Sequence, residues 1–281
     1  MAKLYVINSE RQKEPFSFQK VYNSARRAGA SPKFAQEIAE TIKSEAYPGI
    51  ETSEIFRRIN NLLKKESPKT AIRFNLKEAM RKLGPTGFPF EKYIGEVLKK
   101  FGYKVKINQY LPGKCVRSYE IDFVAQKEKV IFIGECKYRH ISGEKVHSQD
   151  ALANYARFLD IYNGPYFNVE KKEGFEIKST MVTNAKFTDK ALDYSNCVKI
   201  KLLGWKVPPK KGLEYLIESK NLYPITILPS LRGRLEEIFV SQKMMLASDV
   251  LKINPQKFAQ KTKVSQKDIY SLIQEAEILL Q

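Results

Sequence analysis

The sequence predicts an α/β protein, with a mixed sheet flanked by helices in the middle of the chain and mainly helical segments on either side. Residues 88–203 read as helix, three strands, helix, strand, helix and strand, and this succession is typical of a sheet covered by helices. Of the 281 residues 43% are hydrophobic, which is enough to bury cores in more than one domain. We expect domain boundaries at residues 1–84, 86–205 and 206–281.

The first segment begins with a short strand, Leu4–Ile7, and continues with helices that have clear start signals. Ser31-Pro32 and Ser67-Pro68 each place a capping residue before a first-turn proline. The last predicted helix, Thr70–Leu83, stops at Gly84-Pro85, which marks the first boundary.

The helix predicted over residues 88–102 brings one acid toward the sheet. Its apolar residues recur at helical spacing, at Phe90, Ile94, Val97, Leu98 and Phe101. Glu91 falls at the border of this apolar stripe, whereas Glu96 falls on the opposite, lysine-lined face. We therefore expect Glu91 to face the sheet and Glu96 to face solvent.

Two predicted strands, residues 119–125 and 130–137, carry Asp122, Glu135 and Lys137. Strand side chains alternate, so Glu135 and Lys137 share a face while Cys136 points the other way. Such charges are either edge residues or a buried ion pair, or they serve a site, because unused charges in a sheet are costly. A divalent metal would satisfy both acids, and the lysine could orient or deprotonate an attacking water. Other Glu-x-Lys pairs occur, but only this one follows an unbroken apolar run with an Asp on the preceding strand.

The rest of the middle segment supplies more of the sheet and its covering helices. A helix is predicted from Lys145 to Ile161, with three aromatic residues on one face that we assign to the core: Tyr155, Phe158 and Tyr162. Strands are predicted over 175–183 and 198–203, with Thr188 as the cap of the helix between them.

The C-terminal segment is predicted to be helical over 235–246, 255–263 and 265–280. Ser265-x-x-Asp268 has the form of a capping box at the start of the last helix. The preceding turn, residues 261–267, is rich in lysine and hydroxyl groups that suit phosphate contacts. Two interpretations of this segment stay open: a pair of helices that binds DNA, and a set of helices that only covers the core of the middle segment.

With these motifs in order, residues 86–205 resemble the PD-(D/E)xK endonuclease family, and within it the Mrr-like, type IV restriction branch. The resemblance implies that Asp122 and Glu135 hold Mg²⁺, with Mn²⁺ as a substitute and the Cys136 carbonyl as a further ligand. It implies that Glu91 acts directly or through water and that Lys137 positions the nucleophile. The chain departs from the family's leading Pro-Asp, since Ile121 precedes Asp122.

By the same resemblance, several residues are candidates for contact with DNA. Gln149 is a candidate for the glutamine that some relatives carry on the helix after the Glu-x-Lys strand. Basic residues flanking the site would follow the phosphate backbone, which is a salt-sensitive and sequence-neutral contribution. These candidates are Arg117, Arg139, Lys145 and Lys186.

Residues 1–84 resemble the ATP-cone, a small regulatory nucleotide-binding domain, in Pro15–Val21, Phe34–Ala46 and Ile55–Leu63. The family's Lys-Arg-Asp-Gly hairpin is replaced here by residues 8–12, so the basic pair that would meet phosphates is largely missing. Arg11 and Lys20 are the candidates for phosphate contact. Binding of ATP or dATP and a helical arm that binds no nucleotide are both open.

The charge of the chain points to a polyanionic partner. A formal net charge of +18 exceeds what solubility needs and suits DNA. The sequence contains no long apolar segment of the kind that crosses a membrane. Its three cysteines are scattered, and with only two histidines they cannot build a structural zinc site. The N-terminus lacks the apolar core of a signal peptide, so we expect a cytoplasmic protein.

The function expected from the sequence is a Mg²⁺-dependent endodeoxyribonuclease that restricts foreign or modified DNA, acting as a homodimer by the same resemblance. Two alternatives stay open. One is a DNA-binding or nucleotide-sensing protein with an inactive nuclease core, and the other is a structure-specific resolvase that uses the same chemistry on branched DNA.

Overall fold

The structure is a computed structural model that describes residues 4–84 and 89–281. The chain packs as two compact units, of which one runs from Arg81 to Tyr223. The other combines the chain up to Met80 with Pro224–Gln281. The C-terminal helices thus share a unit with the N-terminal segment, whereas the sequence suggested three consecutive segments. Pro85, part of the predicted stop, lies outside the described residues.

The unit from Arg81 to Tyr223 is built on a five-stranded sheet of order β10-β8-β6-β5-β4. β6, β8 and β10 run parallel to one another, and β4, β5 and β6 form an antiparallel meander. The mixed sheet flanked by helices predicted from the sequence is confirmed. Its elements are α6 (Phe90–Lys100), β4 (Lys104–Leu111), β5 (Tyr119–Lys127), β6 (Val130–Lys137), β7 (Lys145–Val146), α7 (Ser148–Tyr162), α8 (Asn168–Lys172), β8 (Glu176–Thr183), β9 (Lys186–Phe187), α9 (Asp189–Cys197), β10 (Lys201–Leu203) and α10 (Leu213–Ser219).

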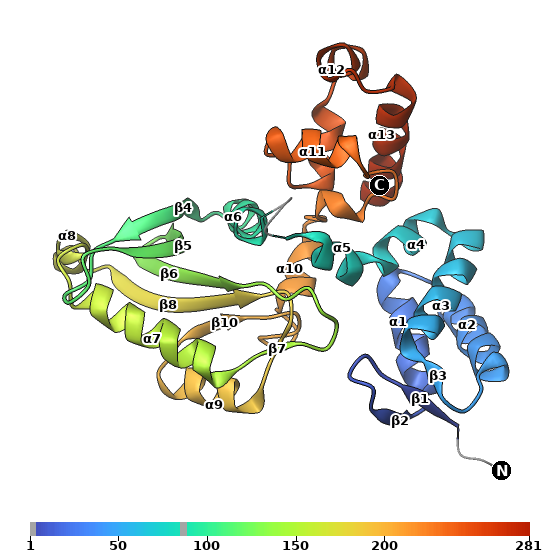
Figure 1. The fold of residues 1–281 in the computed structure, drawn as a ribbon, viewed down its shortest axis with the longest axis horizontal. Helices are drawn as coiled ribbons and strands as arrows, with labels where there is room; N and C mark the ends of the chain where they lie inside the picture. The colour runs from blue at the N-terminus through green and yellow to red at the C-terminus, as the bar shows by residue number, and fades with distance from the viewer. Residues whose placement is uncertain (1–3, 85–88) are drawn as a thin grey trace. The chain divides into compact units, whose positions relative to one another are not determined.

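Helices cover both faces of this sheet, with α7 and α9 along one side and α6 along the other (Figure 1). On the α7 side, Ile131 and Ile133 of β6 pack with Ile161. Phe132 alternates to the opposite face, where it lines a cavity of about 320 Å³ with residues of α6 and α10. Gly95 allows α6 to lie close to β4, because a Cβ there would stand 2.8 Å from the Ile107 side chain.

Three predictions for this unit need correction. The helix expected from Lys145 begins at Ser148, because residues 145–146 form β7, which pairs with β9 in a separate small sheet. The aromatic face of α7 is only partly core: Tyr155 and Phe158 stack at 6.1 Å, but Tyr162 is 38% exposed. The last strand, predicted from Val198, is limited to β10 because the chain turns between α9 and Lys201.

The second unit joins a small sheet, of order β2-β1-β3, to helices from both ends of the chain. Ser31 and Ser67 are N-caps, and their hydroxyls accept hydrogen bonds from the amides of Phe34 and Thr70, as the sequence predicted. The elements are β1 (Tyr5–Ile7), β2 (Lys13–Pro15), α1 (Phe18–Ala28), α2 (Pro32–Glu45), β3 (Ile50–Glu51), α3 (Thr52–Glu66), α4 (Pro68–Phe74), α5 (Leu76–Lys82), the 3₁₀ helix η1 (Ile225–Ile227), α11 (Arg234–Ser241), the 3₁₀ helix η2 (Ala247–Lys252), α12 (Pro255–Thr262) and α13 (Gln266–Leu280).

The single helix predicted over Thr70–Leu83 is wrong in one respect, since it is broken into α4 and α5 at Asn75. The Asn75 side chain donates to the Ala71 carbonyl and pairs with Asn60, so it takes up a backbone acceptor that a continuous helix would use.

The C-terminal helices are shorter than predicted in one place and joined to the N-terminal helices. α11 ends at Ser241 rather than Leu246, since Lys243 adopts a left-handed conformation with φ 58°. Ser265 is the N-cap of α13, but its side chain makes no capping hydrogen bond, so the predicted capping box is wrong. α13 packs against α4, and the Thr226 hydroxyl donates to the Ala79 carbonyl, so these segments form one core.

Among the described residues no helix is long and apolar enough to cross a membrane.

Candidate active site

The site lies where β5 and β6 separate. Their pairing ends at Phe123 opposite Gly134, so Asp122 and Glu135 are the next residues beyond the ladder. There the Asp122 carboxylate accepts a hydrogen bond from the Cys136 backbone amide at 2.6 Å. This bond takes the place of a backbone hydrogen bond between the two strands. This contact fixes the Asp122 carboxylate beside β6.

The packing at the end of this ladder depends on a glycine. A Cβ on Gly134 would lie 2.1 Å from Cζ of Phe123, so the aromatic ring lies directly over the glycine backbone. Phe123 is 1% exposed, and its ring therefore holds the strand that carries Asp122 against the strand that carries Glu135.

Glu135 is a buried carboxylate held by two cations. It is 8% exposed, and its two oxygens meet Lys137 Nζ at 2.8 Å and an Arg157 guanidinium nitrogen at 2.6 Å. Lys137 reaches it along the strand, as the alternation of side chains predicts. Arg157 comes from α7 and was not predicted, because neither its place in a helix nor its flanking residues mark it as facing a carboxylate.

Glu91 lies in the first turn of α6 and acts on the same site through its charge. The pKa of Asp122 is raised from 3.8 to about 6, chiefly by burial. The Cys136 amide and the Lys137 ammonium lower this pKa, while the carboxylates of Glu135 and Glu91 raise it. Glu96 instead pairs with Lys99 at 2.8 Å, as expected for the outer face of the helix.

Cys136 lies between Glu135 and Lys137 on β6. Burial raises the pKa of its thiol well above the usual value, and the charges of Asp122 and Glu91 raise it further. The thiol therefore stays protonated, and it is poorly suited to act as a nucleophile or a metal ligand.

A second group of charges lies at the N-terminal end of α7. Asp150 pairs with Arg139 at 3.1 Å and lies 4.0 Å from Lys137 Nζ. The Asn184 amide oxygen accepts the Arg139 backbone amide at 2.8 Å. The Arg139 guanidinium is thus engaged within the protein, and its contact with DNA stays a prediction.

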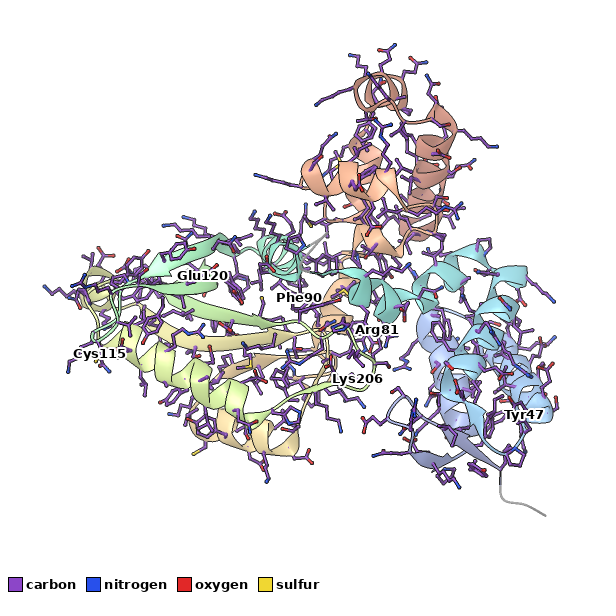
Figure 2. All side chains as sticks on the ribbon, viewed as in Figure 1. Tyr47, Arg81, Phe90, Cys115, Glu120 and Lys206 are labelled. Atoms are coloured by element: carbon purple, nitrogen blue, oxygen red, sulfur yellow. The ribbon has the colours of Figure 1, made fainter. Side chains whose placement is uncertain are left out.

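The other DNA-contact candidates divide between the two ends of α7. Lys145 and Lys186 are exposed partners on β7 and β9, and Gln149 is exposed in the first turn of α7. Arg117 lies in the β4–β5 connection, which Cys115 marks in Figure 2 and which bonds through its amides to Asp160, near the C-terminal end of α7. Arg117 therefore does not cluster with the other three.

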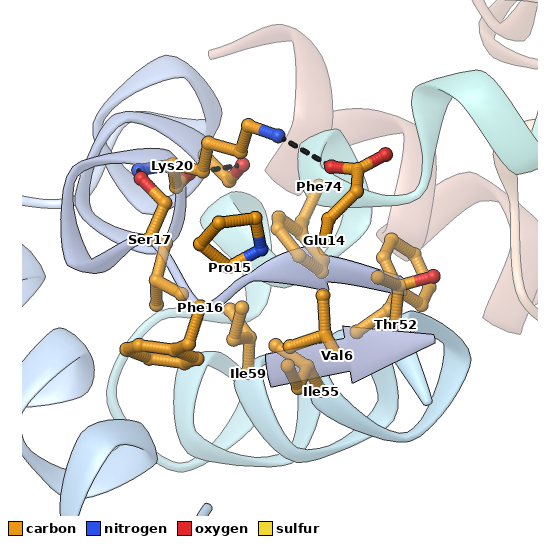
Figure 3. A pocket seen from close by; sticks show the side chains of 13 residues that line it. Val6, Glu14, Pro15, Phe16, Ser17, Lys20, Thr52, Ile55, Ile59 and Phe74 are labelled. Carbon is orange, nitrogen blue, oxygen red and sulfur yellow. Dashed lines mark hydrogen bonds and ion pairs between the residues drawn. The ribbon is translucent and has the colours of Figure 1, made fainter. Parts of the chain in front are cut away.

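Of the two nucleotide candidates, one lines a separate pocket in the other unit, with a volume of about 200 Å³ (Figure 3). Its walls are largely apolar and include Phe16, Phe56 and Phe74. Lys20 is at this pocket, but its ammonium pairs with Glu14 at 2.8 Å. Arg11 is exposed in the turn after β1 and does not line the pocket, so the structure does not bring Arg11 and Lys20 together there.

Comparison with known proteins places the chain in a family. A protein of Archaeoglobus fulgidus described as uncharacterized is 37% identical over 167 residues, which cover 58% of this chain and 87% of that protein. A family described as "AF1548-like, C-terminal" matches residues 223–280, nearly the same span as the C-terminal part of the discontinuous unit. The chain belongs to the AF1548-like family.

The crystal structure of the family protein AF1548, described as a protein of unknown function, is similar to this chain, with a TM-score of 0.55 and 33% identity. The similarity covers 68% of this chain and 96% of that one. The MspJI restriction endonuclease, solved in complex with a 27-mer oligonucleotide, gives a TM-score of 0.31 at 11% identity. That likeness covers 62% of this chain and 38% of MspJI, and it is too weak to support a conclusion about the family's fold or activity.

The carboxylates of this family member fit a divalent ion by donor type but are not arranged as a finished site. Oxygen ligands from carboxylates are what Mg²⁺ and Mn²⁺ take in proteins, and one or two protein carboxylates are enough for Mg²⁺. Within the described ranges, no group of three or more His, Cys, Asp or Glu side chains converges so that it could hold a metal ion. Asp122 and Glu135 are therefore the fitting pair, and Glu135 is engaged by cations from the protein itself.

Proposed function

We propose that this protein is a divalent-metal-dependent endodeoxyribonuclease that hydrolyses DNA phosphodiester bonds. One observation carries the proposal: two carboxylates and an ammonium, on Asp122, Glu135 and Lys137, meet where two strands part, with Glu91 near enough to raise the pKa of Asp122. Burial is the chief cause of this raised pKa and the charges of Glu135 and Glu91 add to it, so a bound cation would neutralise carboxylates that the fold otherwise disfavours as charged groups.

In this proposal Asp122 and Glu135 hold the ion, with the Cys136 carbonyl as a further ligand and Glu91 acting directly or through water. Mg²⁺, or Mn²⁺ in its place, would acidify a bound water and neutralise charge that develops on the phosphate. Lys137 is fixed beside Glu135 at 2.8 Å, where its ammonium can donate a hydrogen bond that orients the attacking water. It would accept the proton of that water only as the neutral amine, after losing a proton of its own.

The substrate we propose is foreign or modified DNA, in keeping with the Mrr-like resemblance, and the acting form a homodimer. The net charge of +18 supports a nucleic-acid partner, since clustered lysine and arginine side chains gain affinity by releasing counterions from phosphates. The exposed pair Lys145 and Lys186, with Gln149 nearby on α7, supplies such a surface beside the site.

A second function is favoured by a different observation. Because both oxygens of Glu135 are engaged by Lys137 and Arg157, the core could be a catalytically inactive nuclease fold that retains DNA binding. In such a protein the two cations would permanently neutralise Glu135, and these ion pairs would have a structural role alone.

Cleavage of supercoiled plasmid separates these two functions. We expect nicking with Mg²⁺ or Mn²⁺, none with EDTA, and a loss of about a hundredfold or more in the Asp122→Asn and Lys137→Met variants. Lys178→Met is a matched control, because Lys178 forms a similar ion pair with Glu176, and both residues lie on β8 rather than on the strands of the site. Retained DNA binding without nicking by the wild-type protein would establish the inactive core instead.

For the N-terminal pocket we propose at most weak ATP or dATP binding. The pocket is mainly apolar, and its candidate cation, Lys20, is paired with Glu14. Calorimetry on the full chain should detect no tight binding, and a submicromolar dissociation constant would contradict this proposal.

A further inference from the structure

Among the residues that the structure describes, Arg157 is the group that reaches Glu135 from a helix rather than from the sheet. Its guanidinium extends from α7 and lies 2.6 Å from one Glu135 oxygen, while Lys137 of β6 lies 2.8 Å from the other. Neither contact is fully solvent-exposed: the side chains of Arg157 and Lys137 are 29% and 27% exposed, and that of Glu135 is 10% exposed.

This arrangement conflicts with simultaneous binding of a metal ion. A divalent ion on Glu135 would lie in contact range of two other positive groups in a partly buried place, where repulsion between like charges is weakly screened. One of the two protein cations must therefore give way when the ion binds to this carboxylate.

The surroundings indicate which cation gives way. Lys137 has a second acid, Asp150, at 4.0 Å, and its short path along β6 keeps it at the site. Among the described residues, Glu135 is the acid with which Arg157 forms an ion pair, and the Arg157 side chain is long enough to turn away from α7. A guanidinium released in this way suits a phosphate oxygen of bound DNA, which it can meet with two parallel hydrogen bonds.

We propose that Arg157 is an exchangeable counter-ion: it occupies Glu135 in the metal-free protein and yields that carboxylate to the divalent ion. The inference rests on the proposed function, because it requires a metal ion at Glu135. Arg157 is thus a positioning residue that keeps Glu135 neutralised and ordered until the ion and DNA arrive, and it lowers the affinity for the ion alone.

Binding of Mn²⁺ to the full chain without DNA, followed by the paramagnetic resonance signal of free Mn²⁺, tests this exchange. The Arg157→Gln variant should bind Mn²⁺ about tenfold more tightly than the wild type, or about 1.4 kcal/mol. Arg157→Lys keeps the charge and should remain near the wild type, and Glu135→Gln should lose the site. Arg58→Gln is the matched control, because Arg58 pairs with Glu45 and Glu54 in the other unit.

The possible outcomes separate the inference from the function beneath it. If Arg157→Gln binds Mn²⁺ equally well or more weakly than the wild type, while Glu135→Gln abolishes binding, the exchange is refuted and the metal site stands. If the wild type and Arg157→Gln bind no Mn²⁺, or if Glu135→Gln does not weaken the binding, both the exchange and the proposed function fail. Should the glutamine variant not fold, Arg157→Met, which keeps the aliphatic stem, tests the same expectation.

Discussion

Asp122 is a carboxylate whose folded environment disfavours its charge. Its pKa of about 6, against the usual 3.8, means that the folded protein binds this proton more tightly than the unfolded chain does. The contribution of this group to the free energy of unfolding is therefore largest below about pH 4 and is lost as the pH rises through about 6.

Replacing the charge should stabilise the protein when no metal is present. In EDTA at pH 7.5, Asp122→Asn should raise the free energy of unfolding by about 1–2 kcal/mol, a value reduced from the full shift because the side chain is partly exposed. At about pH 4 the gain should nearly vanish, since the wild-type carboxyl is then protonated in the fold. Urea unfolding at both pH values measures this difference, and an equal gain at both would contradict the raised pKa.

Gly134 should tolerate no side chain. In Gly134→Ala the new Cβ would stand 2.1 Å from the buried Phe123 ring, and the resulting overpacking should cost about 1–3 kcal/mol. Gly84→Ala is the matched control, since the nearest atom to its Cβ is the Tyr138 hydroxyl at 3.9 Å. Denaturant midpoints compare the two variants, and part of the loss should be recovered in Phe123→Leu/Gly134→Ala. A neutral Gly134→Ala would show that Phe123 does not lock the two strands together.

At the same scale, the sequence indicated Asp122, Glu135 and Lys137 because a strand alternates and because charges between apolar residues are conspicuous. Arg157 and Asp150 gave no such signal, since arginine and aspartate on the surface of a helix are ordinary. Their partners are set by where α7 lies across the sheet, and that placement is a property of tertiary packing rather than of local sequence.

At the scale of the elements, the helices differ in whether the N-cap side chain accepts a hydrogen bond from the first turn. Ser31 accepts the Phe34 amide at 3.1 Å, whereas the Ser265 side chain makes no capping bond. Ser31→Ala should therefore cost about 1 kcal/mol and Ser265→Ala close to nothing. Thermal or urea unfolding measures both, and equal losses would show that Ser265 caps α13 in solution.

The elements themselves were largely predictable, and their ends were less so. Apolar runs fixed β5, β6 and β8, and Ser-Pro pairs fixed the starts of α2 and α4. The break between α4 and α5 depends on Asn75 meeting Asn60 of α3, a contact between residues 15 apart that no helical periodicity reveals. The short strand β7 was missed because its partner, β9, comes some forty residues later.

At the scale of the whole molecule, a destabilising substitution in one part of the discontinuous unit should loosen both of its chain segments, the one up to Met80 and Pro224–Gln281. Leu272 of α13 is fully buried, and Leu272→Ala should cost about 2–5 kcal/mol. Because α13 packs against α4, hydrogen exchange should accelerate both in residues up to 80 and in 224–281, and much less in 81–223. Faster exchange confined to 224–281 would show that the C-terminal helices are an independent domain.

This grouping could not be predicted from the sequence, because a boundary signal such as Gly84-Pro85 marks where one segment ends but not which distant segment completes its core. The match of the AF1548-like C-terminal family to residues 223–280 begins at nearly the same place as the structural division at Pro224. The net charge of +18, by contrast, follows directly from the sequence, and it indicates the chemical class of a partner but not the partner itself.

The most direct test of the metal-dependent nuclease is a crystal structure of the protein with Mn²⁺ and a short DNA duplex, in which the ion is located by its anomalous scattering. We expect an anomalous peak in contact with both Asp122 and Glu135, beside a DNA phosphate and within reach of Lys137 through a water. An ordered duplex with no peak at these two carboxylates, and with Arg157 still on Glu135, would contradict the assignment.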